Sequence, residues 1–340
     1  MLSTQETGAM RPTAFEEPLS SLELCAGAGG LALGLEQAGF DPVLLLDSRP
    51  VACETLRLNR PAWDVRAMDL HRFNPADHPQ AHKVDLLAAG LPRVKSAATN
   101  SRARGSALEL GLLTYTISLV RGVQPRALLV ENVPDLVTKD TFASTRKRVG
   151  ETLEDLGYRY RWFVLNAVDH GVPQDRKQGV LVALVADLMD AFDEPLSGRE
   201  VSGTVGSVLK ESMSARGWMQ VDEWADQANQ VAPTLVGGSW DRGGADLGPT
   251  GTKRAWATMG VDGGTVADQV PGPEFHWDPT RGRSGMVRLT VEQAARLQGF
   301  PPDWHFAGRK TARYRQVGHA SPPPVGRALG RAVRDALGGR

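Results

Sequence analysis

Short apolar runs alternate with helical patterns along roughly the first 185 residues of the chain. The runs lie at 22–25, 43–46, 84–88 and 127–130, and the segments 162–167 and 179–185 are candidates for later strands. Helical periodicity covers 31–38 and surrounds 51–59, and a further strand is expected to end near Asp69. Uniformly apolar strands that alternate with helices are typical of a parallel sheet covered on both faces. The pattern therefore predicts an α/β fold of the doubly wound kind.

The residue composition of the sequence changes near Pro195. From there to about residue 285, Gly, Ser, Thr and Trp dominate and little helical periodicity is present. We expect a smaller, loop-rich domain at 196–309, inserted into a first domain formed by 21–195 plus 310–340. The polar, proline-broken residues 1–20 are predicted to be a flexible tail.

Composition narrows the class of protein only modestly. The chain has 340 residues, of which 41% are hydrophobic and 23% charged, and no apolar run reaches the roughly eighteen residues of a membrane span. The amino terminus lacks the apolar core of a signal peptide, which favours the cytoplasm. The net charge of +0 gives no overall basic field. Cys25 and Cys53 have a spacing that fits neither a metal knuckle nor a disulfide framework.

A glycine turn follows the first predicted strand, at Gly27, Gly29 and Gly30. Missing side chains let a ligand approach the backbone, and the next helix offers free N–H groups. Asp47 ends the second strand, where a carboxylate can accept hydrogen bonds from both hydroxyls of a ribose. These residues predict a nucleotide-like cofactor, the alternative being that the glycines only make a tight turn.

Five further segments occur in a characteristic order. Together they resemble the ordered motifs of the DNA cytosine-5 methyltransferase family, and the resemblance extends over nearly the whole chain from Leu22. It implies a Rossmann-like class I methyltransferase domain with a target-recognition domain, S-adenosylmethionine (or S-adenosylhomocysteine) as the ligand, and double-stranded DNA as the partner. The segments are LELCAGAGGLALGLEQAGF (22–40), LLVENVPDLV (128–137), GVPQDRKQGVLVAL (171–184), RLTVEQAARLQGFPPDW (288–304) and RQVGHASPPPVGRALG (315–330).

The resemblance implies a particular chemistry. In the family a cytosine is flipped out of the duplex, and a cysteine thiolate attacks its C6 so that C5 can accept the methyl group. An acidic residue holds the N3 edge of the ring, and Glu131 stands at the matching position. A protonated Glu131 would suit that contact. The alternative is that Glu131 is a surface carboxylate at a strand end.

The nucleophile of the family is missing from the matching position. Family members carry it in a Pro-Cys step, and here the step reads Pro92-Arg93. An arginine stays protonated and cannot act as a nucleophile. Cys25 is assigned to the cofactor turn and Cys53 to the helix after the second strand, so neither replaces it. We therefore predict a divergent member that is inactive alone.

Two more departures fall at functional positions. In the Gln-x-Arg-x-Arg segment of the family, Arg176 keeps the first arginine, whereas Gln178 replaces the second, which helps to hold the flipped base. His319 replaces an asparagine that helps to hold the methionine end of the cofactor. His319 can still form hydrogen bonds, so the change weakens the expected cofactor site without removing it.

The remaining cofactor positions match the family. Gly27, Gly29, Gly30 and Asp47 correspond to the turn and the ribose carboxylate, and Asp69 corresponds to the residue that contacts adenine. Cys25 stands in the place of an aromatic residue that stacks on the adenine, and its soft sulfur is a tolerable exchange. We expect the protein to bind S-adenosylmethionine.

Candidate DNA contacts in the inserted domain are Arg242, Lys253 and Arg254. Their loops are rich in Gly, Ser, Thr and Trp, which suits contacts to base edges and phosphates. Residues 201–285 nevertheless carry seven Lys/Arg against ten Asp/Glu, a net charge of −3 that opposes phosphate binding. The alternative is that these side chains only support the loops.

The leading hypothesis is a pseudoenzyme of this family. It would assist an active methyltransferase subunit, or occupy DNA sites, in DNA methylation or restriction-modification. Two alternatives stay open. One is an active DNA cytosine-5 methyltransferase whose nucleophile is displaced or supplied by a partner. The other is an S-adenosylmethionine-dependent enzyme with a different substrate, in which Arg93 binds an anion.

Overall fold

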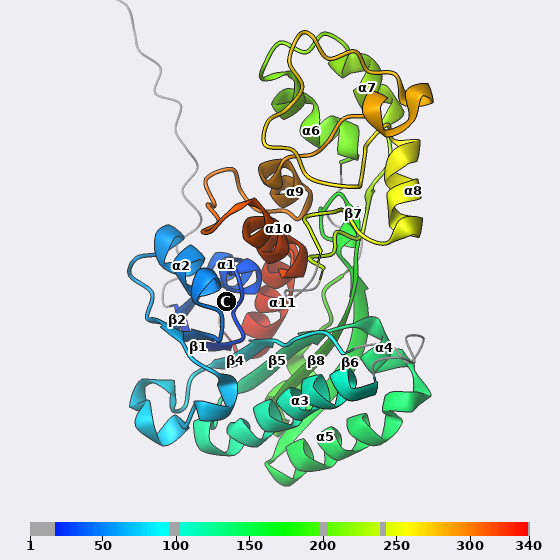
Figure 1. The fold of residues 1–340 in the computed structure, drawn as a ribbon. Helices are drawn as coiled ribbons and strands as arrows, with labels where there is room; N and C mark the ends of the chain where they lie inside the picture. The colour runs from blue at the N-terminus through cyan, green and yellow to red at the C-terminus, as the bar shows by residue number, and fades with distance from the viewer. Residues whose placement is uncertain (1–17, 95–102, 197–202, 239–242, 339–340) are drawn as a thin grey trace, which may run out of the picture.

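A seven-stranded sheet forms the centre of the first domain (Figure 1). The structure, a computed structural model, describes residues 18–94, 103–196, 203–238 and 243–338. The strand order is β3-β2-β1-β4-β5-β8-β6. β3, β2, β1, β4 and β5 are parallel, whereas β8 is antiparallel to both β5 and β6. The strands are β1 Leu19–Leu24, β2 Phe40–Asp47, β3 Val65–Ala67, β4 Leu86–Gly90, β5 Ala127–Asn132, β6 Tyr158–Asn166 and β8 Lys177–Val185.

Helices cover both faces of this sheet (Figure 1). α1 (Gly30–Gln37), α2 (Pro50–Asn59) and α11 (Pro323–Ala336) lie on one side, and α3 (Ala103–Val123), α4 (Pro134–Thr138) and α5 (Ala143–Asp155) lie on the other. Side chains of the inner strands alternate between two apolar clusters. In β5, Leu128 and Val130 join the cluster beneath α3, whereas Ala127 and Leu129 join the one beneath α11. This alternation is why the inner strands are apolar throughout.

A second lobe stands above the sheet (Figure 1). It contains α6 (Val205–Ser214), α7 (Val221–Gln227) and α8 (Thr250–Thr258), while α9 (Val291–Leu297) and α10 (Lys310–His319) lead back to the first domain. A short strand of the first domain, β7 (Gln174–Asp175), pairs with β9 (Ala232–Pro233) of the lobe. The buried Trp224 and Trp256 belong to one apolar cluster with Leu33 and Leu45 of the first domain. The two parts therefore share a continuous core.

Short 3₁₀ helices complete the described secondary structure. They are η1 Leu70–Arg72, η2 Pro75–Asp77, η3 Pro79–Ala81, η5 Asp140–Phe142, η6 Ala167–Asp169, η7 Ala186–Ala191 and η8 Pro279–Gly285. Within the described residues, no helix is both long and apolar enough to cross a membrane.

The predicted α/β fold is confirmed, with four corrections. The sheet is mixed, because its last two strands run antiparallel to their neighbours. The third strand ends at Ala67 rather than near Asp69, which instead caps η1. β1 begins at Leu19, so a tail that extends to residue 20 is wrong by two residues, and the rest of that prediction (1–17) lies outside the described residues. The inserted part is also more helical than expected, since Thr204 and Ser207 form a capping box that starts α6.

Candidate active and cofactor site

The loop after β4 carries Arg93 and is fixed by the strand beside it. The side-chain Oδ1 of Asn132 accepts a hydrogen bond from the Val94 N–H at 3.0 Å, and its Nδ2 donates to the Pro92 carbonyl at 3.3 Å. Asn132 therefore grips the backbone on both sides of Arg93. The Asn of the Glu-Asn-Val motif thus sets the position of the loop that carries Arg93.

Glu131, near the end of β5, is buried and does not lie on the surface. Only 7% of the residue is exposed, which excludes the reading of a surface carboxylate. Gln178 Nε2 donates to Glu131 Oε1 and also lies 3.0 Å from the Ser321 hydroxyl. Burial raises the pKa of Glu131, while Arg93 and hydrogen bonds from Gln178 and Ser321 oppose that rise. Two of the predicted residues, Glu131 and Gln178, are thus in direct contact, and Arg93 is near enough for its charge to act on Glu131.

His319, the last residue of α10, contacts the second lobe. Its Nε2 is 2.9 Å from the Gly238 carbonyl. Loss of solvation and repulsion from Arg93, and also from Arg49, lower the pKa of His319, although part of the residue is exposed. Arg49 also acts on the carboxylate of Asp47 at the cofactor side. The neutral ring of His319 is thus held against the glycine segment of the second lobe, and its role toward a cofactor stays a prediction.

Arg176 is buried, and its side chain joins separate segments of backbone. It is 0% exposed and donates to the carbonyls of Leu235 (2.8 Å), Gly318 (3.3 Å) and Ala320 (2.9 Å). The Gly318 and Ala320 carbonyls lie on either side of His319 along the chain, whereas the Leu235 carbonyl belongs to the second lobe. Arg176 therefore has the contacts of a positioning residue, and a direct contact to substrate stays a prediction.

Two glutamines extend this network, and the sequence motifs that contain them meet here. Gln174 Nε2 donates to Gln298 Oε1 at 2.6 Å, and its own Oε1 accepts from the Leu235 N–H at 2.8 Å. Gln298 Nε2 donates to the Ala320 carbonyl at 2.6 Å. The Gln-Gly-Phe-Pro segment and the Pro-Gln-Asp-Arg segment are thus linked through one buried hydrogen-bond network, which we call the joint.

The cofactor residues also converge, around the turn after β1. Asp47 Oδ2 accepts from the Gly27 N–H and Oδ1 accepts from the Arg49 N–H, each at 2.8 Å, so the carboxylate is fixed at the turn. Each oxygen retains a further lone pair. A Cβ built on Gly27 would meet no atom within 4 Å, so there is open space above the turn. The charges of Asp47 and of the exposed Asp69 both act on Cys25, so both carboxylates lie near this cysteine.

Gly29 and Gly30 serve the turn in another way. A Cβ on Gly30 would lie 2.0 Å from the Ser321 carbonyl oxygen, and one on Gly29 would lie 2.6 Å from the Leu56 side chain. These glycines allow the turn to pack closely against α2 and the segment before α11. Their contact with a cofactor stays a prediction.

Neither cysteine has the environment of an activated nucleophile. Burial, followed by the negative charges of Asp47 and Asp69, raises the pKa of Cys25 to about 12. Burial also raises the pKa of Cys53, whose thiol lies 3.5 Å from the Asp47 carbonyl. Both stay thiols at neutral pH, and a thiol is a far weaker nucleophile than a thiolate.

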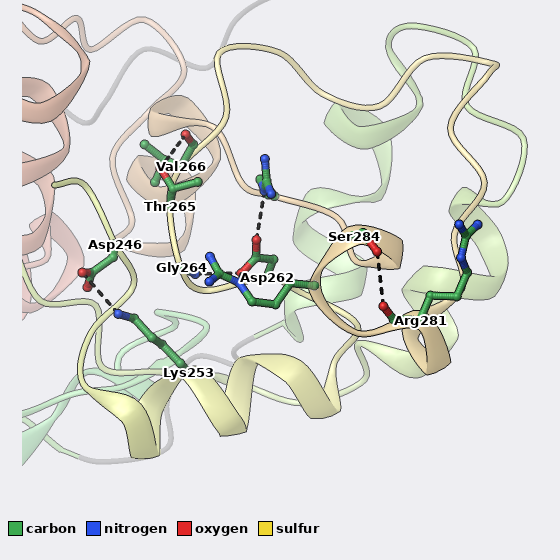
Figure 2. Close-up of polar contacts among 10 residues, drawn as sticks. Asp246, Lys253, Asp262, Gly264, Thr265, Val266, Arg281 and Ser284 are labelled. Atoms are coloured by element: carbon green, nitrogen blue, oxygen red, sulfur yellow. Dashed lines mark hydrogen bonds and ion pairs between the residues drawn. The ribbon is translucent and has the colours of Figure 1, made fainter.

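The predicted DNA contacts divide into three cases. Arg242 lies outside the described residues. Lys253 lies beside Asp246, with Nζ 3.3 Å from the carboxylate, so its charge is partly compensated (Figure 2). Arg254, one residue further along α8, is exposed. Of the predicted contacts within the described residues, Arg254 is the more accessible.

An arginine cluster in the second lobe was not predicted from the sequence. Asp262, whose residue is 2% exposed, accepts from Arg283 Nε at 2.7 Å, Arg288 Nε at 2.9 Å and the Gly264 N–H at 2.9 Å (Figure 2). Burial acts to raise the pKa of Asp262, but these donors outweigh that effect and hold the pKa below its usual value. The available signal was the Arg-Gly-Arg run at 281–283. Ser321, which acts on Glu131, was also missed because serine in a turn is too common to stand out.

The seven-stranded sheet, with a glycine turn that contacts the acidic end of β2, has the architecture of a class I methyltransferase domain. The model of the C-5 cytosine-specific DNA methylase family matches residues 19–335. The chain belongs to this family, whose methyl donor is S-adenosylmethionine.

Curated relatives agree with this assignment. The chain is 43% identical over 327 residues to the Type II methyltransferase M.NaeI of Lentzea aerocolonigenes, covering 94% of this chain and 76% of that protein. It is 38% identical over 325 residues to the Type II methyltransferase M.NgoMIV of Neisseria gonorrhoeae, covering 94% and 98%.

Solved structures share the fold at low sequence identity. DNMT2 of Spodoptera frugiperda has a TM-score of 0.63 at 16% identity, covering 93% of this chain and 99% of that one. The methyltransferase EhMeth of Entamoeba histolytica has a TM-score of 0.65 at 13% identity, covering 95% and 99%.

Proposed function

We propose that this protein binds S-adenosylmethionine and double-stranded DNA but transfers no methyl group to cytosine alone, because Arg93 stands where the nucleophile belongs. On this proposal it is a non-catalytic member of the family that acts with, or on the sites of, an active methyltransferase. The single observation that carries the proposal is the position of Arg93. It follows β4 in a loop that Asn132 fixes, next to the buried Glu131.

The chemistry supports the loss of methyl transfer. Attack on C6 needs a group that donates an electron pair, and a guanidinium has no such pair to give at neutral pH. Cys25 and Cys53 have raised pKa values and lie at the cofactor side of the site. A partner-supplied cysteine would have to enter beside Arg93, between Glu131 and His319.

The cofactor half of the proposal rests on residues that fit the ligand. Asp47 is fixed with free lone pairs at the turn, and Gly27 leaves open space above it. Asp47 would hold the ribose hydroxyls, and Asp69 and Cys25 would lie toward the adenine. When bound, S-adenosylmethionine supplies an electrophilic methyl group.

The role in the cell is proposed from the relatives. They are named Type II methyltransferases, which points to DNA modification in a restriction-modification setting. We propose residues 21–195 plus 310–340 as the cofactor-binding domain, and 196–309 as the target-recognition domain.

A methyl-transfer assay tests the catalytic half. Purified protein is incubated with labelled S-adenosylmethionine and mixed-sequence duplex DNA, and cofactor binding is measured in the same sample. We expect bound cofactor and no label at cytosine C5. Label in the DNA from the wild-type protein alone would refute the proposal. Arg93→Cys serves as the matched variant, because it restores a thiol at the position.

A second assay tests the DNA half. Fluorescence anisotropy with a labelled mixed-sequence duplex should show weaker binding for Arg254→Ala, and a salt slope reduced by about 0.9 if one phosphate contact is lost. The control is Lys210→Ala, because Lys210 is exposed on α6 but pairs with Asp222. Equal affinities for the two variants would remove Arg254 from the proposed interface.

A further inference from the structure

A buried carboxylate in the second lobe holds two exposed arginines. The side chain of Asp262 is 2% exposed, whereas those of Arg283 and Arg288 are 68% and 47% exposed. Asp262 Oδ1 accepts from Arg283 Nε at 2.7 Å, and Oδ2 accepts from Arg288 Nε at 2.9 Å. One negative charge thus faces two positive charges, so the group retains a net positive charge.

Each guanidinium keeps its outer edge available. Within the part of the chain that the structure describes, neither Arg283 nor Arg288 donates a hydrogen bond through Nη1 or Nη2. The N–H groups on these atoms form the edge of a guanidinium that binds the oxygens of a phosphate in pairs. Because Asp262 already fixes both Nε atoms, less side-chain freedom is lost when that edge takes up a ligand.

Two glycines bring these arginines next to α8. A Cβ built on Gly263 would lie 3.3 Å from Lys253 Cγ, and one on Gly264 would lie 1.7 Å from Arg283 Nη2. The glycine turn therefore packs against the stem of Lys253 and also against the guanidinium of Arg283. Figure 2 shows Lys253 on α8 beside the segment that carries Gly264. Lys253 is one of the predicted DNA contacts, so the arginines extend the surface on which that contact lies.

The arginines form a positive region in an otherwise acidic lobe. Residues 201–285 carry a net charge of −3, whereas residues 279–291 contain three arginines and no Lys, Asp or Glu. Salt at physiological ionic strength screens exposed charges beyond about 8 Å, so a phosphate responds to the charges closest to it rather than to the net charge of a domain. An acidic lobe can therefore contact DNA through this region.

We infer that Arg283 and Arg288, held in place by Asp262, bind the phosphate backbone of double-stranded DNA. Asp262 is a positioning residue in this arrangement, because it fixes the two guanidinium groups without touching the DNA. The inference rests on the proposed binding of double-stranded DNA and is independent of the proposed loss of methyl transfer. An ion pair that only stabilised the lobe would make the same contacts with Asp262, but its loss would leave DNA affinity unchanged.

The salt dependence of DNA binding tests the two charges. Fluorescence anisotropy is measured with the full chain and a labelled mixed-sequence duplex at about 50–200 mM salt. Arg283→Met and Arg288→Met should each lower the salt slope by about 0.9, and weaken binding about eightfold at about 0.1 M salt, if each loses one phosphate contact. In either variant Asp262 keeps the other arginine and the Gly264 N–H, so we expect the fold to persist, and thermal melts verify this.

The matched control is Arg159→Met. Arg159 has a comparable exposure of 53% and also pairs with one carboxylate, that of Asp190. Its register partner Leu184 pairs in turn with Ala127, which places Arg159 at the amino end of β5, the end away from the candidate site. This variant loses the same charge and should bind the duplex like the wild-type protein.

Gly264→Ala tests the position of Arg283 without changing any charge. The new Cβ would overlap Nη2, so the guanidinium has to move away from Asp262, and the end of a flexible side chain can do so while the backbone stays in place. We expect weaker DNA binding with a melting temperature close to that of the wild type. Combined with Arg283→Met, Gly264→Ala should cause no further loss, because the group that it displaces is gone.

The outcomes separate this inference from the proposed function. Affinities and salt slopes of Arg283→Met and Arg288→Met equal to those of Arg159→Met would overturn the inference and leave the proposed DNA binding in place. Weaker binding with an unchanged salt slope would also overturn the phosphate contact. A wild-type protein that does not bind the duplex would overturn both the inference and the proposed DNA binding.

Discussion

Replacing Arg176 by methionine should show whether this residue stabilises the fold by holding backbone segments together or serves only to contact a substrate. The change removes the donors that serve three main-chain carbonyls, those of Leu235, Gly318 and Ala320. Each buried carbonyl left without a donor costs about 1–3 kcal/mol. The Ala320 carbonyl keeps Gln298 as a donor, so two carbonyls are left without one. Taking the low end for both, because removal of a buried guanidinium offsets part of the loss, gives a destabilisation of about 2 kcal/mol.

The assay is thermal and urea unfolding of the full chain, with Lys177→Met as the matched control. Lys177 is the next residue along the chain, is exposed, and loses the same charge to the same new side chain. The control should stay within about 0.5 kcal/mol of wild type. At about 2 °C per kcal/mol for a chain of this size, Arg176→Met should lower the melting temperature by about 4 °C. Equal stabilities of the two variants would refute the assignment of Arg176 as a joint.

Three further predictions address the cofactor turn, the last helix and a buried carboxyl. Asp47→Asn should weaken S-adenosylmethionine binding at least tenfold in calorimetric titration, since an amide accepts through one atom only; unchanged affinity would remove Asp47 from the site. Gly34→Ala should destabilise the protein by more than about 2 kcal/mol in urea unfolding, because its Cβ would lie 2.4 Å from the Pro323 carbonyl oxygen. The control is Gly111→Ala, which should stabilise the protein by about 0.5–1 kcal/mol, because its Cβ would meet no atom within 4 Å. Equal effects of the two substitutions would contradict the packing of α1 on α11. Burial raises the pKa of Glu23 from 4.5 to about 8, so its contribution to stability is present below 4.5 and lost as pH rises to 8. Glu23→Gln should therefore gain stability over wild type across that range, by roughly 3 kcal/mol at pH 7, and a constant difference would show that Glu23 does not titrate there.

The sheet and its helices were predictable because each inner strand is buried on both faces. Runs such as 43–46 and 127–130 are apolar at every position, as expected of a strand whose side chains pack both above and below the sheet. The direction of a strand, in contrast, has no signature in its pattern of apolar residues. β8 is as apolar as β5, so its antiparallel course could not be predicted from its residues.

The second lobe was harder to predict because its stability comes from a few large side chains. Trp224 and Trp256 are fully buried, but they sit in short helices flanked by glycine and polar residues, where periodicity has little length over which to appear. The contact between Glu131 and Gln178 was predictable, since both residues lie in segments that match ordered motifs, whereas their roles and that of Arg93 stay predictions. The joint around Arg176 was not predictable, because its acceptors are main-chain carbonyls, which carry no sequence signal.

The packing of α11 on α1 also orders events during synthesis on the ribosome. Arg334 Nη1 donates to the Gly39 carbonyl across 295 positions of sequence, at 2.8 Å. At about 5–20 residues per second, the first helix emerges about 15–60 s before the helix that covers it. During that time Leu31 and Leu35 lack the contacts that α11 makes with them, and the nascent chain exposes part of its apolar surface. Translation that stops before Pro323 would leave that surface uncovered, so the codons from Pro323 onward decide whether it is buried.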